Sequence, residues 1–286
     1  MKLDNITYSH EHMVIDLTKG KNDPDCYLNL YQFALDELKE IKSKGVKRIV
    51  DCSNHGIGVD WQINQKIQQE TGLTIINSTG CYKDPFLPQW FDDKSVEQLA
   101  ELFLSDLNKG ARVIGEIGTS KDKMTENEKK LFEASCLAYH KAEVKPVIIT
   151  HTTLGSFALQ QVQFFKEHDV DLRKVIISHT ALANNMEMIL ELLKQGVNIA
   201  FDTIGKKKYL PDETRAQFIK EAIDNGYRDQ LLMSMDLTRQ SHLKKNGGVG
   251  LSYLIDCFIP ELLKLSVKES DIETITCCNF ERILNL

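Results

Sequence analysis

Eight short runs typical of β-strands alternate with longer helical patterns along this chain, and no other feature constrains its fold as strongly. Several runs, such as Val175-Ile176-Ile177-Ser178, are apolar almost throughout, as expected of strands buried on both faces of a parallel sheet. The predicted strands are Ile6–Asp16, Val46–Ser53, Leu73–Thr79, Arg112–Gly118, Pro146–His151, Val175–His179, Val197–Thr203 and Leu231–Met235.

The segments between these strands carry apolar residues at helical spacing. Between Leu30 and Ile41 they recur every three or four positions ahead of Gly45, a residue typical of helix ends. Further helices are predicted at Glu126–Ala142, Phe157–His168, Met186–Gln195 and Asp212–Asn225. Eight strand–helix units in 286 residues favour a closed (β/α)8 TIM barrel over an open doubly wound sheet.

Composition and net charge limit the number of domains and the kinds of partner that we expect. With 42% hydrophobic and 27% charged residues and no composition break, the chain is predicted to form a single domain over residues 1–286. A net charge of -6 disfavours nucleic acid as a partner. Neither a signal peptide nor an apolar run of about twenty residues is recognisable. We therefore expect a cytoplasmic protein without a membrane partner.

Residues that commonly bind metals fall at the ends of the predicted strands, where barrel enzymes place their chemistry. His10 and His12 lie on one face of the first strand, because successive side chains point to opposite faces. Each residue alone could have a structural role, such as a satisfied core histidine or a helix cap. Together they predict a metal site, since buried polar groups need partners. The candidate ligands are His10, His12, Glu116, His151, His179 and Asp236.

Basic and aromatic side chains follow the seventh and eighth predicted strands, where barrels commonly recognise anionic groups. Arg239 is the first candidate, because its planar guanidinium can hold a carboxylate or phosphate through two hydrogen bonds. A solvated basic loop is the alternative interpretation. The candidate substrate-binding residues are Arg239, Lys206, Lys208, Tyr209 and His242.

Six motifs, in order, resemble those of the phosphotriesterase-related proteins of the amidohydrolase superfamily, in particular the homology-protein branch. The resemblance spans essentially the whole chain. The motifs are Ser-His-Glu-His at 9–12, Gly115-Glu116-Ile117-Gly118-Thr119, Thr150-His151-Thr152, Ser178-His179, Phe201-Asp202-Thr203-Ile204-Gly205-Lys206 and Ser234-Met235-Asp236-Leu237-Thr238-Arg239.

The resemblance implies two divalent metal ions per chain, usually Zn²⁺. In that scheme His10, His12 and Asp236 hold one ion and the strand-five and strand-six histidines hold the other. Glu116 takes the bridging position that a carboxylated lysine occupies in phosphotriesterases proper. Two departures from the family leave the substrate open, because Ala181 and Thr203 stand where relatives often carry an aspartate and an arginine.

Such a centre predicts hydrolysis by a hydroxide that bridges the metals, because two cations lower the pKa of a shared water from about 15.7 to about 7. Asp236 would accept the proton and Glu116 would complete the catalytic centre. We expect a small, anionic ester substrate, a lactone or a phosphorylated or acidic lactone. The alternatives are a phosphotriester or phosphodiester hydrolase, or a non-catalytic metal-binding barrel. The resemblance also suggests a homodimer.

Overall fold

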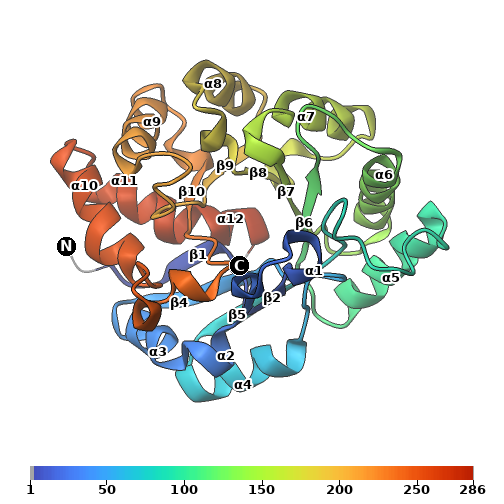
Figure 1. Cartoon of the computed structure of the whole chain (residues 1–286). Helices are drawn as coiled ribbons and strands as arrows, with labels where there is room; N and C mark the ends of the chain where they lie inside the picture. Colours follow the sequence, from blue (N-terminus) through green and yellow to red (C-terminus); the bar gives the residue numbers. More distant parts are fainter. Residues whose placement is uncertain (1–2, 286) are drawn as a thin grey trace.

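A computed structural model describes residues 3–285 as eight parallel strands arranged in a ring (Figure 1). Each strand pairs with the next in the order β1-β4-β5-β6-β7-β8-β9-β10. The Ser9 hydroxyl donates to the Met233 carbonyl at 3.2 Å, which brings the first strand beside the last. The strands are β1 (Ile6–Glu11), β4 (Val46–Asp51), β5 (Thr74–Thr79), β6 (Val113–Thr119), β7 (Val147–Thr152), β8 (Val175–Ser178), β9 (Asn198–Phe201) and β10 (Leu231–Met233). The predicted TIM barrel is confirmed.

Helices surround this ring, and their apolar faces pack on the outside of the strands. The main ones are α3 (Leu35–Ser43), α4 (Trp61–Thr71), α5 (Val96–Asn108), α6 (Glu126–Lys141), α7 (Ala158–Glu167), α8 (Met186–Lys194) and α9 (Asp212–Asp224). The chain continues into α10 (Ile259–Lys264), α11 (Glu269–Glu273) and α12 (Asn279–Leu284). None of the helices within residues 3–285 combines the length and apolar character needed to cross a bilayer.

The C-terminal helix closes the amino end of the barrel. Phe280 and Ile283 of α12 pack against apolar residues from inside the barrel, including Val113. The Arg112 guanidinium, just before β6, donates to the Leu284 carbonyl at 3.0 Å. The chemistry of the barrel is therefore confined to its opposite, carboxyl end.

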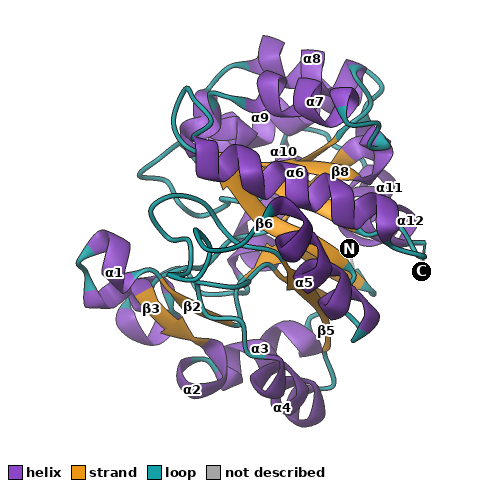
Figure 2. Cartoon of the chain, turned by 90° about the vertical axis from the view of Figure 1, so that its right-hand side faces the viewer, coloured by secondary structure: helices purple, strands orange, loops and turns teal. Residues whose placement is uncertain are grey.

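The predicted first strand, Ile6–Asp16, is divided in two, which is a correction to the sequence-based prediction. β1 ends at Glu11, and β2 (Val14–Asp16) instead pairs antiparallel with β3 (Tyr27–Asn29). The turn is held by the Met13 N–H, which donates to the buried Asp51 carboxylate at 3.0 Å. In Figure 2, β2 and β3 lie with the long loops, on the side away from both termini.

A second correction concerns the helix predicted from Leu30 to Ile41. It is interrupted at Ala34, whose φ of -145° is not helical, and forms α2 (Leu30–Phe33) followed by α3. The other predicted helices begin and end within about two residues of their expected bounds, as α6 does, where Thr125 and Glu128 form a capping box.

Candidate metal centre

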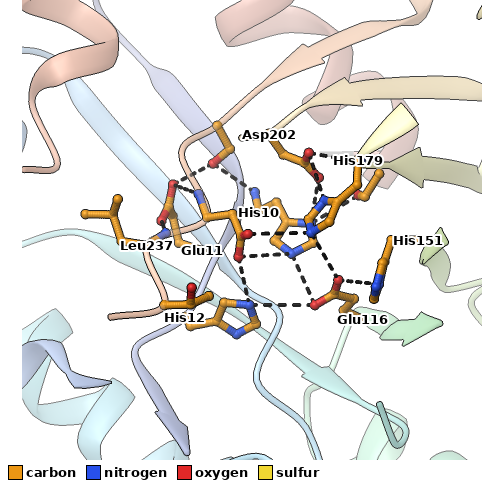
Figure 3. A network of polar contacts seen from close by, with 12 residues as sticks. His10, Glu11, His12, Glu116, His151, His179, Asp202 and Leu237 are labelled. Atoms are coloured by element: carbon orange, nitrogen blue, oxygen red, sulfur yellow. Dashed lines mark hydrogen bonds and ion pairs between the residues drawn. The ribbon is translucent and has the colours of Figure 1, made fainter. Parts of the chain in front are cut away.

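Glu116 lies between two pairs of histidines at the carboxyl end of the barrel (Figure 3). One of its oxygens, Oε2, is 3.4 Å from His10 Nε2 and 3.7 Å from His12 Nε2. The other, Oε1, is 2.5 Å from His151 Nδ1 and 3.8 Å from His179 Nε2. The structure thus brings together five predicted ligands that come from β1, β6, β7 and β8 or from residues directly after them.

These side chains form two groups that could each hold a metal ion, His10–His12–Glu116 and Glu116–His151–His179, with ligand atoms within 4.8 Å of one another. Glu116 belongs to both. Although the Glu116 oxygens lie close to the ring nitrogens, four buried ligand atoms make no hydrogen bond of acceptable geometry within residues 3–285, namely His10 Nε2, His12 Nε2, His151 Nδ1 and Glu116 Oε1. Unpaired buried polar atoms are costly, and imidazole nitrogens and carboxylate oxygens are common ligands of divalent metals. The donor set therefore fits divalent metal ions.

Burial and neighbouring charges shift the pKa values of the candidate ligands. Burial would raise the pKa of Glu116, but the neighbouring His151 and His10 outweigh it and hold that pKa well below its usual range. Burial lowers the pKa of His151, so this ring is neutral at pH 7. Burial would lower the pKa of His10 and of His179, but nearby acidic groups, Glu116 among them, outweigh it and raise both pKa values. A metal ion would bind the Glu116 carboxylate and the neutral His151 ring directly and would have to displace a proton from His10 and His179.

Asp236 lies at the edge of the same cluster, just beyond β10. Its Oδ1 is 3.2 Å from His12 Nε2, and its Oδ2 is 3.5 Å from His179 Nε2. The Lys206 ammonium also donates to Oδ2. Burial alone would raise the pKa of Asp236, but Lys206 outweighs that effect and keeps the carboxylate ionised. In this structure Asp236 is therefore shared between the histidine cluster and a lysine.

Each histidine of the cluster is also held through its second ring nitrogen. Such contacts fix the orientation of a metal-binding imidazole and tune its basicity. The contacts are His10 Nδ1 to Ser178 Oγ (3.1 Å), His12 Nδ1 to Ser53 Oγ (3.1 Å), His151 Nε2 to the Tyr82 hydroxyl (3.3 Å) and His179 Nδ1 to Asp202 Oδ1 (3.0 Å).

The sequence analysis gave no role to Asp202, which is fully buried behind two of the candidate ligands. Its Oδ1 accepts the backbone N–H of His179 at 3.0 Å, and its Oδ2 lies 3.2 Å from His10 Nδ1. Burial would raise the pKa of Asp202, but His179 and His10 outweigh it and leave that pKa well below its usual range. Its position at the end of the predicted strand Val197–Thr203 was the signal that could have identified it.

Glu11, between the two histidines of the first motif, points to the opposite face and binds the segment that carries Asp236. Its Oε1 accepts the backbone N–H groups of Met235 and Asp236 at 2.7 and 3.1 Å. It also accepts the Ser234 hydroxyl at 2.8 Å, and Oε2 accepts the Leu237 N–H at 3.0 Å. One buried carboxylate therefore positions the whole turn after β10.

We expect Glu11→Gln to loosen this turn. The amide would replace one accepting oxygen by a donor that faces a backbone N–H, so the variant should lose about 1–3 kcal/mol of unfolding free energy. Urea denaturation measures this change, with the exposed Glu143→Gln as the matched control. A Glu11→Gln protein as stable as the control would contradict this role.

A cavity of about 330 Å³ lies over the candidate metal centre, and three of the five predicted substrate-binding residues line it, Lys206, Tyr209 and Arg239. Lys208 and His242 do not line this cavity, whereas all five residues line a neighbouring cavity of about 570 Å³. The structure therefore brings the five side chains together, and their role in substrate binding stays a prediction.

Arg239, the first candidate for substrate binding, is already engaged. Its guanidinium lies 2.7 Å from Asp23 Oδ2 and 3.5 Å from Asp25 Oδ2. His242 accepts the Thr238 N–H at Nδ1 (3.3 Å), and burial lowers its pKa to about 4, so its ring is uncharged at neutral pH. Neither side chain offers an unmatched positive charge to a substrate.

Comparison with known proteins agrees with this geometry. The model of the phosphotriesterase family matches residues 3–284. The phosphotriesterase homology protein of Escherichia coli (strain K12) is 37% identical over 276 residues, which cover 94% of this chain and 94% of that protein. Its crystal structure, with phosphate in the active site, covers 99% of this chain and 100% of that one with a TM-score of 0.94 and 34% identity.

More distant relatives carry other activities in their names. An aryldialkylphosphatase of Saccharolobus solfataricus is 29% identical over 240 residues, 80% of this chain and 76% of that protein. A lactonase from Listeria monocytogenes shares the fold with a TM-score of 0.91 at 24% identity, covering 99% of this chain and 95% of that one. The match to the family model over residues 3–284 is decisive, and this chain belongs to the phosphotriesterase family.

Proposed function

We propose that this protein is a binuclear metal-dependent hydrolase of a small ester, a lactone that carries an acidic group. The observation that carries the proposal is the position of Glu116 between two histidine pairs, three of whose four facing nitrogens are buried and make no hydrogen bond within residues 3–285. His10, His12 and Asp236 would hold one ion and His151 and His179 the other, with Glu116 between them. When bound, two divalent cations, Zn²⁺ in the first instance, would supply positive charge and a water of lowered pKa.

The residues of the chain would perform the proton transfer and orient the substrate. Asp236 lines the cavity and is held ionised, so it can accept the proton of the water that attacks the ester. Lys206, in contact with Asp236, keeps that carboxylate at the cavity wall. Asp202 and the hydroxyls behind the histidines keep the rings aimed at Glu116.

The size and charge of the cavity support a small acidic substrate. A volume of about 330 Å³ is at the lower end of the usual range for small-molecule sites. Cationic side chains line it beside the candidate metal centre, and the crystal structure of the Escherichia coli relative holds phosphate in its active site. The name of the Listeria relative supports a lactone as the ester.

Phosphoester hydrolysis is the second candidate, because a binuclear centre can also polarise a phosphoryl oxygen and a relative is named aryldialkylphosphatase. A screen of metal-loaded protein against lactones, linear esters, phosphotriesters and phosphodiesters separates the two. We expect the highest kcat/KM for lactones with a carboxylate or phosphate. No turnover of any class would refute the hydrolase proposal and leave a barrel that only binds metal.

We expect about two divalent ions per chain, the number that the proposed centre requires. Chelation should remove them, abolish turnover and lower the Tm, because a ligand that binds only the folded state stabilises it. Elemental analysis and thermal unfolding before and after dialysis against a chelator provide the measurement. Full activity in protein shown to be metal-free would contradict the proposal.

A further inference from the structure

Four cationic side chains line the cavity over the candidate metal centre, Lys21, Lys83, Lys206 and Arg239. Two of them already have carboxylate partners, because Lys206 contacts Asp236 and Arg239 contacts Asp23. For Lys21 and Lys83, by contrast, no carboxylate oxygen within residues 3–285 lies at ion-pair distance. The unmatched positive charge of the cavity is therefore carried by Lys21 and Lys83.

Lys83 is buried beside the candidate metal centre. It follows β5 and is 9% exposed, and its ammonium donates to the Asp84 carbonyl at 2.8 Å. A Cβ added to Gly118 would lie 3.1 Å from Lys83 Cδ and 2.8 Å from His151 Cε1, so the lysine stem and the histidine ring both pack over this glycine. An ammonium has three donors, and a single carbonyl leaves Lys83 with donors for a ligand.

Lys21 adds a second positive charge to the same part of the cavity. It ends α1 (Thr18–Lys21), and its ammonium lies 5.8 Å from the centre of the Phe86 ring, which also lines the cavity. Burial lowers the pKa of Lys83, and the positive charge of Lys21 acts in the same direction. The carboxylates of Glu128, Glu116 and Asp84 act on the pKa of Lys83 in the opposite direction without reversing the shift, and none of them lies at ion-pair distance. An anionic ligand in direct contact would therefore stabilise the buried ammonium further.

The wall that carries Lys83 and Lys21 lies across the ring from the loop after β9, where substrate-binding residues were predicted from sequence. In the eight-stranded ring, β5 and β9 are four strands apart, which is half of the circumference. Lys83 follows β5 and Lys206 follows β9, two strands on opposite sides of the ring (Figure 1). Glu116, in the middle of β6, also lines the cavity.

We propose that Lys83 and Lys21 form the subsite that holds the acidic group of the substrate, a carboxylate or a phosphate. The identity of the substrate rests on the proposed function, whereas binding of an oxyanion at this wall does not. The subsite would place the acidic group on the β5 side and the ester over Glu116. It would also explain how the site recognises an anion although Arg239 is already paired.

Inorganic phosphate and acetate are the probes, titrated calorimetrically into metal-loaded protein at low ionic strength. We expect Lys83→Met to weaken binding of the favoured anion about tenfold or more, because a buried charge-assisted hydrogen bond is lost. Lys21→Met should weaken it roughly two- to fivefold, since Lys21 is exposed. Lys19→Met removes an exposed charge from the same helix outside the cavity lining and should leave the affinity unchanged.

The two anions distinguish a carboxylate from a phosphate as the group that the subsite prefers. Wild-type affinity for both anions in Lys83→Met and Lys21→Met would overturn the proposal, since the anion would then be held by the metal ions alone. Absence of binding to the wild type would overturn it as well. Lysine-dependent binding in a protein that hydrolyses no ester would support the subsite and reject the proposed function. With an active acidic ester, Lys83→Met should raise KM for that ester and not for its neutral analogue.

Discussion

Glu116→Gln is expected to remove most of the bound metal and, with it, measurable turnover. Glu116 is the one side chain shared by both groups of candidate ligands, with one oxygen facing His10 and His12 and the other facing His151 and His179. The amide keeps the size of the side chain, loses its charge and replaces one ligating oxygen with an NH2 group that cannot bind a cation. We expect metal affinity to fall more than the roughly 10–100-fold typical of residues behind the ligands.

Elemental analysis after gel filtration measures this loss, and circular dichroism shows whether the barrel still folds. The exposed Glu126→Gln, ten residues further along, is the matched control and should retain the wild-type metal content. A folded Glu116→Gln protein with the wild-type metal content would refute the shared-carboxylate centre, whatever its activity.

The barrel was predictable from sequence because its signal is local. Fully apolar runs such as Val147-Ile148-Ile149 are typical of strands buried on both faces. In the helices between them, apolar residues recur every three or four positions. Ligand residues could be identified for the same reason, since each lies in a predicted strand or directly follows one. What brings them together is the topology, which makes the carboxyl ends of all eight strands meet at one face.

The errors occurred where pairing between distant segments decides the structure. Nothing in the run Ile6–Asp16 marks its end at Glu11, because the turn depends on Asp51, and Val14–Asp16 pairs with Tyr27–Asn29. The ion pairs of Arg239 could not be predicted for a similar reason. Its carboxylate partners, Asp23 and Asp25, lie between α1 and β3, more than two hundred positions away in sequence.

The residues that sequence analysis missed act on the candidate ligands from behind or from the opposite wall. Asp202 and Glu11 are carboxylates whose roles depend on which backbone N–H groups they meet in the folded chain. The role of Lys83 could not be predicted from sequence, because a lysine after a strand is usually a solvated loop residue and its burial is known only from the structure.

Asp236→Asn is expected to keep the fold and the metal and to lower kcat by about 10²–10⁴, the usual contribution of a positioned proton acceptor. Asparagine retains the shape of the side chain, and its backbone N–H can still donate to Glu11. The proposed centre assigns Asp236 to one ion, and the asparagine oxygen can still occupy that position, while the ligand atoms of both groups around Glu116 remain. The amide cannot hold a proton at the position of the carboxylate, and it leaves Lys206 without its ionic partner.

Two readouts separate loss of the proton acceptor from a structural defect. Metal content and Tm should match those of the exposed Asp93→Asn control, while kcat for the best ester falls and KM changes little. If Asp236→Asn loses one of the two ions together with its activity, Asp236 acts chiefly as a ligand, as the resemblance to the family implies. If it retains wild-type kcat, Asp236 takes no part in the reaction, and the proton must leave by another group that lines the cavity.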